Sequence, residues 1–159
     1  PLPRYTTTHP NVVLAIGRSK NDNIVVYEFV ADTSSGSVIQ AYWLDIDPKY
    51  IEANRKKGKT DDRVELGMME SSMAYGVKTK PVADNTWSVT MVAIPDKTLT
   101  LRLVDGRPQL ITSINGKDAV LTRVFVATKE GWLKPTVLHV DFFGTDPDSG
   151  EAVTERVNK

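Results

Sequence analysis

The sequence predicts a mainly β protein, an antiparallel β-sandwich or partly closed barrel with one α-helix. The first observation is a pair of turn dipeptides, Asp105-Gly106 and Asn115-Gly116, each flanked by apolar runs, which is the strongest short-range signal for a β-hairpin. The second is residues 98–104, where leucine alternates strictly with polar residues, as in a half-buried strand. Strands joined by tight turns pair antiparallel, and about nine of them in one small domain favour this fold class.

The chain begins with an extended arm, residues 1–11, which holds three prolines and three consecutive threonines. Strands are then expected at residues 12–16, 24–30 and 38–44, separated by polar turns. In the third of these strands Tyr42 and Trp43 point to opposite faces. Both faces of that strand are therefore expected to be covered.

One helix is expected from Asp61 to Tyr75. The charged residues 48–59 form a solvated connection before it, and Thr60 or Asp61 offers an N-cap. Apolar residues then recur at helical spacing, and Gly76 stands where a left-handed residue commonly ends a helix. Its methionine face has two interpretations, which are filling of the core and an adaptable binding surface. These methionines are Met68, Met69 and Met73.

The second half of the chain is expected to be almost entirely β-strand. The strands are residues 87–94, 99–104, 109–114, 119–128 and 136–143, with a short last strand at 151–157 after the turn at 146–150. No internal repeat or interdomain linker interrupts them. We therefore expect one β-rich domain over residues 12–157.

Composition excludes several classes of function. The 20 basic and 20 acidic residues give a net charge of zero, so no global field attracts nucleic acid, and weak self-repulsion makes self-association easier. The absence of cysteine excludes disulfides, thiolate catalysis and cysteine-ligated zinc, and it leaves the compartment undetermined. No apolar run approaches the roughly 20 residues of a membrane helix, and residues 1–4 lack the apolar core of a signal peptide. The two histidines show no ligand spacing, so neither metal nor cofactor is expected.

His139 and Asp141 are the catalytic candidates. Two residues apart on one strand, they point the same way and could act as base and orienter in a hydrolase. No serine stands in a nucleophile-elbow motif, however. The favoured interpretation is that Leu138, Val140 and Phe142 face the core while His139 and Asp141 face solvent or a partner.

Two segments are binding candidates. The polar segment with Arg18, Lys20, Asn21 and Asn23 could hold an anion or a partner's carboxylate, although turn chemistry alone accounts for these residue types. Trp132 and Leu133 lie in an expected loop, where an exposed pair marks a contact surface and a buried pair would cap the open end of a barrel.

Arg123 is a further binding candidate. It alternates with Leu121 and Phe125 on one face of its expected strand. It is therefore either an inward charge that needs a partner, such as a carboxylate ligand, or part of an outward face covered by the helix or by a second subunit.

Five short phrases of the sequence resemble, in order, the motifs of one family. They are RSKNDNIVVY (18–27), AYW (41–43), AYGV (74–77), INGK (114–117) and VDFFGTD (140–146). Over about Val12 to Arg156 the chain is similar to the uncharacterised family called domain of unknown function 4833. The resemblance implies a single β-rich domain with one helix and brings no established activity or catalytic residue. The charged segment 48–59 is longer than the family pattern.

These observations order three hypotheses. The first is a non-enzymatic structural or binding domain that acts through its surface by self-association or assembly into a larger scaffold, with itself or another protein as partner. The second is a small-ligand carrier whose sandwich or barrel interior holds an apolar or carboxylate-bearing molecule, with Arg18, Lys20 or Arg123 as the anchoring charge. The third is a hydrolase that uses His139 and Asp141.

Overall fold

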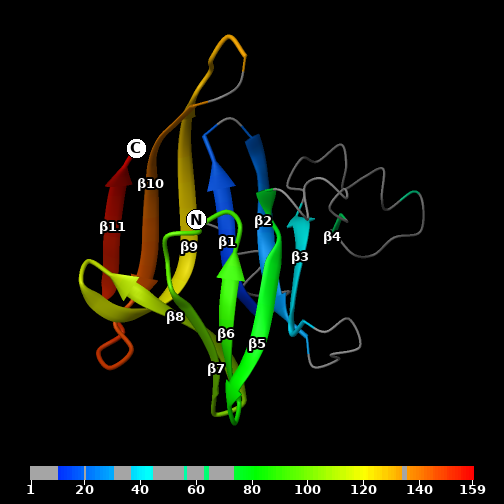
Figure 1. Cartoon of the computed structure of the whole chain (residues 1–159), viewed down its shortest axis with the longest axis vertical. Coiled ribbons are helices and arrows are strands. Elements are labelled where there is room, and N and C mark those ends of the chain that lie inside the picture. The colour runs from blue at the N-terminus through cyan, green and yellow to red at the C-terminus, as the bar shows by residue number, and fades with distance from the viewer. Residues whose placement is uncertain are drawn as a thin grey trace.

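The structure is a computed structural model that describes residues 11–19, 21–30, 37–44, 56, 63–64, 74–133 and 136–159. Figure 1 shows the chain, and its described residues form a mainly β protein. The strands are β1 (Val12–Arg18), β2 (Asn21–Phe29), β3 (Ile39–Leu44), β4 (Arg63–Val64), β5 (Val77–Ala83), β6 (Thr86–Met91), β7 (Leu99–Val104), β8 (Arg107–Ile114), β9 (Lys117–Lys129), β10 (Thr136–Thr145) and β11 (Ala152–Asn158).

The strands form one nearly closed, barrel-like sheet. Its order is β4-β3-β2-β1-β9-β8-β7-β6-β5, and β10 extends the sheet from the other edge of β9 and carries β11. The two tight turns that predicted the hairpins are present, because Asp105, Gly106, Asn115 and Gly116 all have positive φ, as a two-residue turn of this kind requires. β7 runs from Leu99 to Val104, where the alternation of leucines placed it.

β9 joins the two halves of the sheet. On one edge its first residues pair with β8 up to Leu121, and residues Arg123–Val126 pair with Ala15–Arg18 of β1 in parallel. On its other edge it pairs with β10 along almost its whole length. The expected all-antiparallel sheet therefore holds one parallel pair, because β1 and β9 lie far apart in sequence and need no tight turn to join them.

The ends of the sheet approach each other where β5 passes β3. The Val38 N–H donates to Thr79 Oγ1 at 3.1 Å, and the Tyr27 hydroxyl donates to the Tyr75 carbonyl at 3.1 Å. Figure 1 shows β5 and β6 in front of β1 and β2. The space between these layers is the main core. Its most buried side chains are Leu14, Tyr27, Met91, Leu99, Leu101, Leu110, Ile114 and Leu121.

A second cluster of buried side chains lies on the opposite face of β1, β2 and β3. It consists of Ala15, Ile24, Val26 and Tyr42, whereas their neighbours in sequence pack into the main core. Tyr42 is buried in this cluster and Trp43 packs against the main core. The expectation that both faces of this strand are covered is confirmed.

The helix expected from Asp61 to Tyr75 is not supported. Within the described part of this segment, Arg63–Val64 is strand β4, which pairs with Trp43 and Leu44 of β3. Pairing with an open sheet edge satisfies backbone groups that a helix would satisfy internally, and β-branched valine favours the strand. Residues 65–73, with the methionine face, lie outside the described residues, as do the arm residues 1–10 and most of the charged segment 48–59.

The sequence analysis missed β5. Among the described strands it pairs with β6 alone, and most of its side chains are exposed, so it lacks the alternation that marked the other strands. It also contains Pro81, which an edge strand tolerates because one side of its backbone needs no ladder partner.

Candidate functional site: the β9–β10 hairpin tip

The β9–β10 hairpin extends beyond the strands that flank it. The register of β1 with β9 ends at Val126, and the register of β11 with β10 ends at His139. Further along, β9 and β10 pair with each other as far as Lys129 and Thr136. Figure 1 shows this connection at the top of the molecule, above the other strands. The hairpin is therefore a finger that projects from the sheet.

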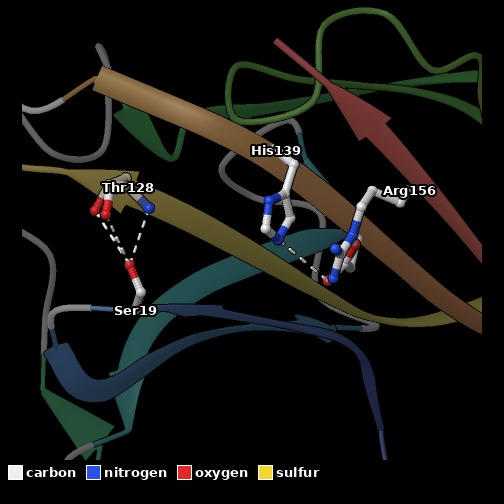
Figure 2. Close-up of polar contacts among 5 residues, drawn as sticks. Ser19, Thr128, His139 and Arg156 are labelled. Atoms are coloured by element: carbon white, nitrogen blue, oxygen red, sulfur yellow. Dashed lines mark hydrogen bonds and ion pairs between the residues drawn. The ribbon is translucent and has the colours of Figure 1, made fainter.

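Two contacts hold the base of this finger. On one side, the Thr128 N–H donates to Ser19 Oγ at 2.9 Å, and the Ser19 N–H donates to the Val126 carbonyl at 3.1 Å. Figure 2 shows Ser19 reaching across to Thr128. On the other side, the Lys159 N–H donates to the Leu138 carbonyl at 3.0 Å. The residues that follow β1 and β11 thus support the finger where it leaves the barrel.

The tip of the finger is apolar and exposed. Trp132 is 97% exposed and Leu133 is 87% exposed, the highest values among the large apolar side chains of the described residues. Val137 and Leu138 on β10 add to the same end at 38% and 46%. Tryptophan is the residue type most enriched at the energetic centres of protein interfaces, and an exposed one beside leucine marks such a surface. Of the two arrangements left open for Trp132 and Leu133, the structure has the exposed pair.

The polar segment around Arg18 does not join this tip. Arg18 ends β1, and its guanidinium carbon lies 4.7 Å from the ring centre of Tyr75, which is buried. The side chains of Asn21 and Asn23 lie outside the described residues, as does Lys20 altogether.

Arg18 belongs to an aromatic cluster at the closing edge of the barrel. Trp43 meets the edge of Tyr75 at 5.6 Å between ring centres, and the Tyr27 hydroxyl donates to the Tyr75 carbonyl. Burial raises the pKa of Tyr27 well above its ordinary value, and the charge of Arg18 opposes part of that rise. The Tyr75 hydroxyl is buried, and no described residue forms a hydrogen bond with it. This cluster stabilises the barrel and leaves one polar atom unsatisfied.

Arg123 lies on the outer face of the sheet. Its guanidinium carbon stands 4.1 Å from the ring centre of Phe143, its cross-strand neighbour on β10. Leu121 pairs with Gly144 and Arg123 pairs with Phe143, so two residues that are not adjacent on β9 face two adjacent residues on β10. The alternation expected for β9 therefore breaks between Leu121 and Arg123. This irregularity leaves Leu121 in the core and turns Arg123 outward. The guanidinium is thus partnered by an aromatic ring.

His139 and Asp141 lie on that same outer face. Val140 and Phe142 are core residues as expected, whereas Leu138 is largely exposed, contrary to expectation, because it lies near the projecting finger. His139 Nε2 is 3.6 Å from Asp141 Oδ2, which is too long for a hydrogen bond.

Asp141 is committed to Arg156 on the neighbouring strand. Arg156 donates through Nε at 2.7 Å and through Nη2 at 3.1 Å, and these hydrogen bonds lower the pKa of Asp141. Figure 2 shows His139 and Arg156 on adjacent strands while Ser19 points at Thr128. In the described part of the chain, the hydrogen bonds of Ser19 go to β9 and none joins it to His139. This arrangement is a cross-strand ion pair beside a histidine.

The sequence analysis missed a pocket of about 220 Å³ between the β6–β7 connection and strands β10 and β11. Its apolar lining includes Ile94, Val140, Phe142 and Val157. Lys97 Nζ lies at its edge, 4.6 Å from the ring centre of Phe142. These residues come from the β6–β7 connection, β10 and β11 and show no common motif, so only the folded register reveals the site.

Glu155 holds Lys97 in place at this pocket. Lys97 Nζ donates to Glu155 Oε1 at 3.1 Å and to the Ser113 carbonyl at 2.7 Å. The Asn115 N–H donates to the same carboxylate oxygen at 2.7 Å, and this bond is the main cause of the lowered pKa of Glu155. The pocket therefore has an apolar floor and an immobilised cation at its edge.

The described residues hold neither a metal-binding cluster nor a membrane-spanning helix. Among them, histidine, aspartate and glutamate side chains form no group of three that could hold a metal ion. In the same part of the chain, no helix has the length and apolar character needed to cross a membrane.

Comparison with known proteins identifies the family and nothing more specific. No curated protein and no solved structure matches the chain. The model of one family, the domain of unknown function DUF4833, matches residues 14–156, which is nearly the whole sequence. The match agrees with the resemblance seen in the five sequence phrases. The chain belongs to the DUF4833 family.

Proposed function

We propose that this protein is a non-enzymatic binding domain that acts through its surface and self-associates through the tip of the β9–β10 finger. The observation that carries this proposal is the near-complete exposure of Trp132 and Leu133 at the end of the finger. Large apolar side chains exposed together lose free energy when another surface covers them, and two such residues at a projecting point are easy for a partner to reach. The zero net charge adds little repulsion between copies.

Two observations favour this role over the alternatives. The barrel interior, where a carried ligand would sit, is occupied by side chains such as Leu14, Leu101 and Leu121, each fully buried. The arginines considered as ligand anchors, Arg18 and Arg123, stack on aromatic rings. For the hydrolase, His139 has Asp141 beside it, and no serine of the described part of the chain forms a hydrogen bond with His139. A surface role depends on the apolar side chains that are exposed at the finger tip.

The test is the solution mass over a range of protein concentrations, by size-exclusion chromatography with light scattering. We expect the wild type to rise above the monomer mass of 17.6 kDa as concentration increases, and the rise to persist at high salt because apolar contact is not screened. Trp132→Ser should shift the association midpoint to a concentration at least about tenfold higher, which is typical for loss of an interface tryptophan.

The matched control is Val82→Ser. Val82 is also an exposed apolar side chain, at 59%, but it lies on β5, the last strand of the sheet path, and not on the finger. The control should associate like the wild type. A wild type that stays monomeric at every concentration contradicts the proposal, and so does a Trp132→Ser variant that associates unchanged.

A further inference from the structure

The molecule carries an exposed knob and an unfilled pocket at two different places. The knob is Trp132 with Leu133 at the tip of the finger, and the pocket lies against the body of β10 and β11. Trp132 is 97% exposed, so it does not fill the pocket of its own molecule. The occupant of the pocket must therefore come from elsewhere, and the chemistry of the pocket walls determines which side chain fits there.

The pocket offers what a tryptophan side chain requires. Its floor is apolar, with Ile94, Val140, Phe142 and Val157, which suits the body of the indole ring. Lys97 is held in place by Ser113 and Glu155 at its edge, and a cation is attracted more strongly to the face of tryptophan than to that of any other side chain.

The pocket also has a hydrogen-bond acceptor and enough volume for this guest. Asp96, whose side chain is 81% exposed, accepts from Lys159 Nζ through Oδ2 at 3.2 Å, and its other carboxylate oxygen lies at the rim, where an indole N–H could donate. A cavity of about 150 Å³ holds a benzene molecule, so about 220 Å³ leaves room for the larger indole ring.

We infer that the finger tip of one molecule inserts Trp132 into the pocket between Ile94, Lys97 and Phe142 of a second copy of this chain. This inference rests on the proposed self-association and names the surface that receives the tip. The donor and acceptor surfaces differ, so the contact is heterologous, and each molecule in a row gives one tip and accepts another. Head-to-tail chains or closed rings follow, rather than a two-fold dimer.

The test uses two variants that each damage one half of the contact. Trp132→Ser removes the knob and keeps the pocket. Ala93→Glu places a larger charged side chain at a half-buried position of the pocket lining and keeps the knob. Ala93→Ser is its matched control, because it changes polarity with little change in volume, and a thermal melt of each variant confirms that it folds.

Mixing distinguishes this contact from any other mode of association. Each damaged variant alone should need at least about tenfold higher concentration than the wild type to associate, while Ala93→Ser behaves as the wild type. An equimolar mixture of Trp132→Ser and Ala93→Glu should form dimers of one copy each and stop there, because only one intact knob and one intact pocket remain to pair.

The outcomes separate this inference from the proposed function. If Ala93→Glu is folded and associates like the wild type while Trp132→Ser does not, the tip mediates self-association but meets another surface, and the pocket inference is overturned. If Trp132→Ser associates unchanged, the proposed function fails as well. If the wild type remains monomeric and instead sediments with anionic lipid vesicles through Trp132, the finger is a membrane contact and both proposals are overturned.

Discussion

The Thr128 N–H donates a hydrogen bond of 2.9 Å to the hydroxyl of Ser19, a residue 109 positions earlier in the chain. The two hydroxyl oxygens lie 3.3 Å apart as well. This contact joins the end of β1 to the last part of β9, just where the finger leaves the sheet. It ties the position of the apolar tip to the body of the barrel.

Ser19→Ala is therefore expected to loosen the base of the finger. One hydrogen bond of this kind contributes about 0.5–1.5 kcal/mol, so the global free energy of unfolding should fall by no more than that. The sharper effect should be local, as faster amide hydrogen exchange at Thr128. The exchange at Leu101, in the core of β7, is the internal reference and should stay slow. Equal acceleration at both amides would contradict a local role for Ser19.

Asp141→Asn is expected to make stability less dependent on pH. The two hydrogen bonds from Arg156 lower the pKa of Asp141 below its ordinary value. The folded state then binds a proton less readily than the unfolded state, so this carboxylate stabilises the fold at neutral pH, and the stabilisation is lost as pH falls below about 4.

The measurement is urea unfolding at pH 7 and at about pH 3. Asp141→Asn should lower the urea midpoint at pH 7 and show a smaller deficit in acid, because protonation of Asp141 then begins to remove the same ion pair from the wild type. Asp148→Asn, which changes an exposed carboxylate in the β10–β11 turn, is the control. An equal deficit of Asp141→Asn at both pH values would argue against the ion pair as the cause.

Gly144→Ala is expected to be strongly destabilising. A Cβ atom at this position would lie 2.2 Å from the Val120 carbonyl oxygen and 2.7 Å from Ile114, so the backbone of β9 would have to move. Overpacking of this kind costs about 1–3 kcal/mol or more. Gly17→Ala is the matched control, because its nearest neighbours would lie at 3.7 Å and 3.8 Å, which is ordinary contact. Thermal melts should separate the two variants clearly, and similar melting temperatures would refute the close approach.

Tyr27→Phe and Tyr75→Phe should change the free energy of unfolding by different amounts or in opposite directions, although each removes one buried hydroxyl. The Tyr27 hydroxyl donates to the Tyr75 carbonyl, so its loss leaves a buried acceptor without that donor and should cost about 1–3 kcal/mol. The Tyr75 hydroxyl has no hydrogen-bond partner among the described residues, so its loss should be neutral or stabilising. Chemical denaturation of both variants measures the difference. A larger loss for Tyr75→Phe would show that its hydroxyl does have a partner.

Local sequence signals predicted much of the sheet, because alternation and turn dipeptides act over a few residues. Asp105 and Asn115 mark turns where they stand, and β7 begins and ends as expected. Pairings between distant segments could not be predicted. The irregularity that turns Arg123 outward depends on β10, and the ion pair of Asp141 depends on β11. The helix expectation failed at Arg63–Val64 because a distant edge of the sheet supplied partners that local propensity does not record.

The candidate site divides in the same way. An exposed Trp132 could be expected from its loop context, since the turn and its residue types are local. The pocket could not, because Lys97, Phe142 and Glu155 meet only through the packing of β10 and β11 over the β6–β7 connection. Their spacing in sequence carries no signal of that contact.

The parallel pairing of β1 with β9 bears on how the chain is made. Residues Ala15–Arg18 find their partners only at Arg123–Val126, so a nascent chain emerging from the ribosome holds the first hairpin with one open edge until most of the protein has been translated. Closing so long a loop is slow relative to forming hairpins. Protection of β1 from exchange should therefore appear late in refolding, together with β9 and after the β7–β8 hairpin, and that unpaired interval is when the young polypeptide most needs a chaperone.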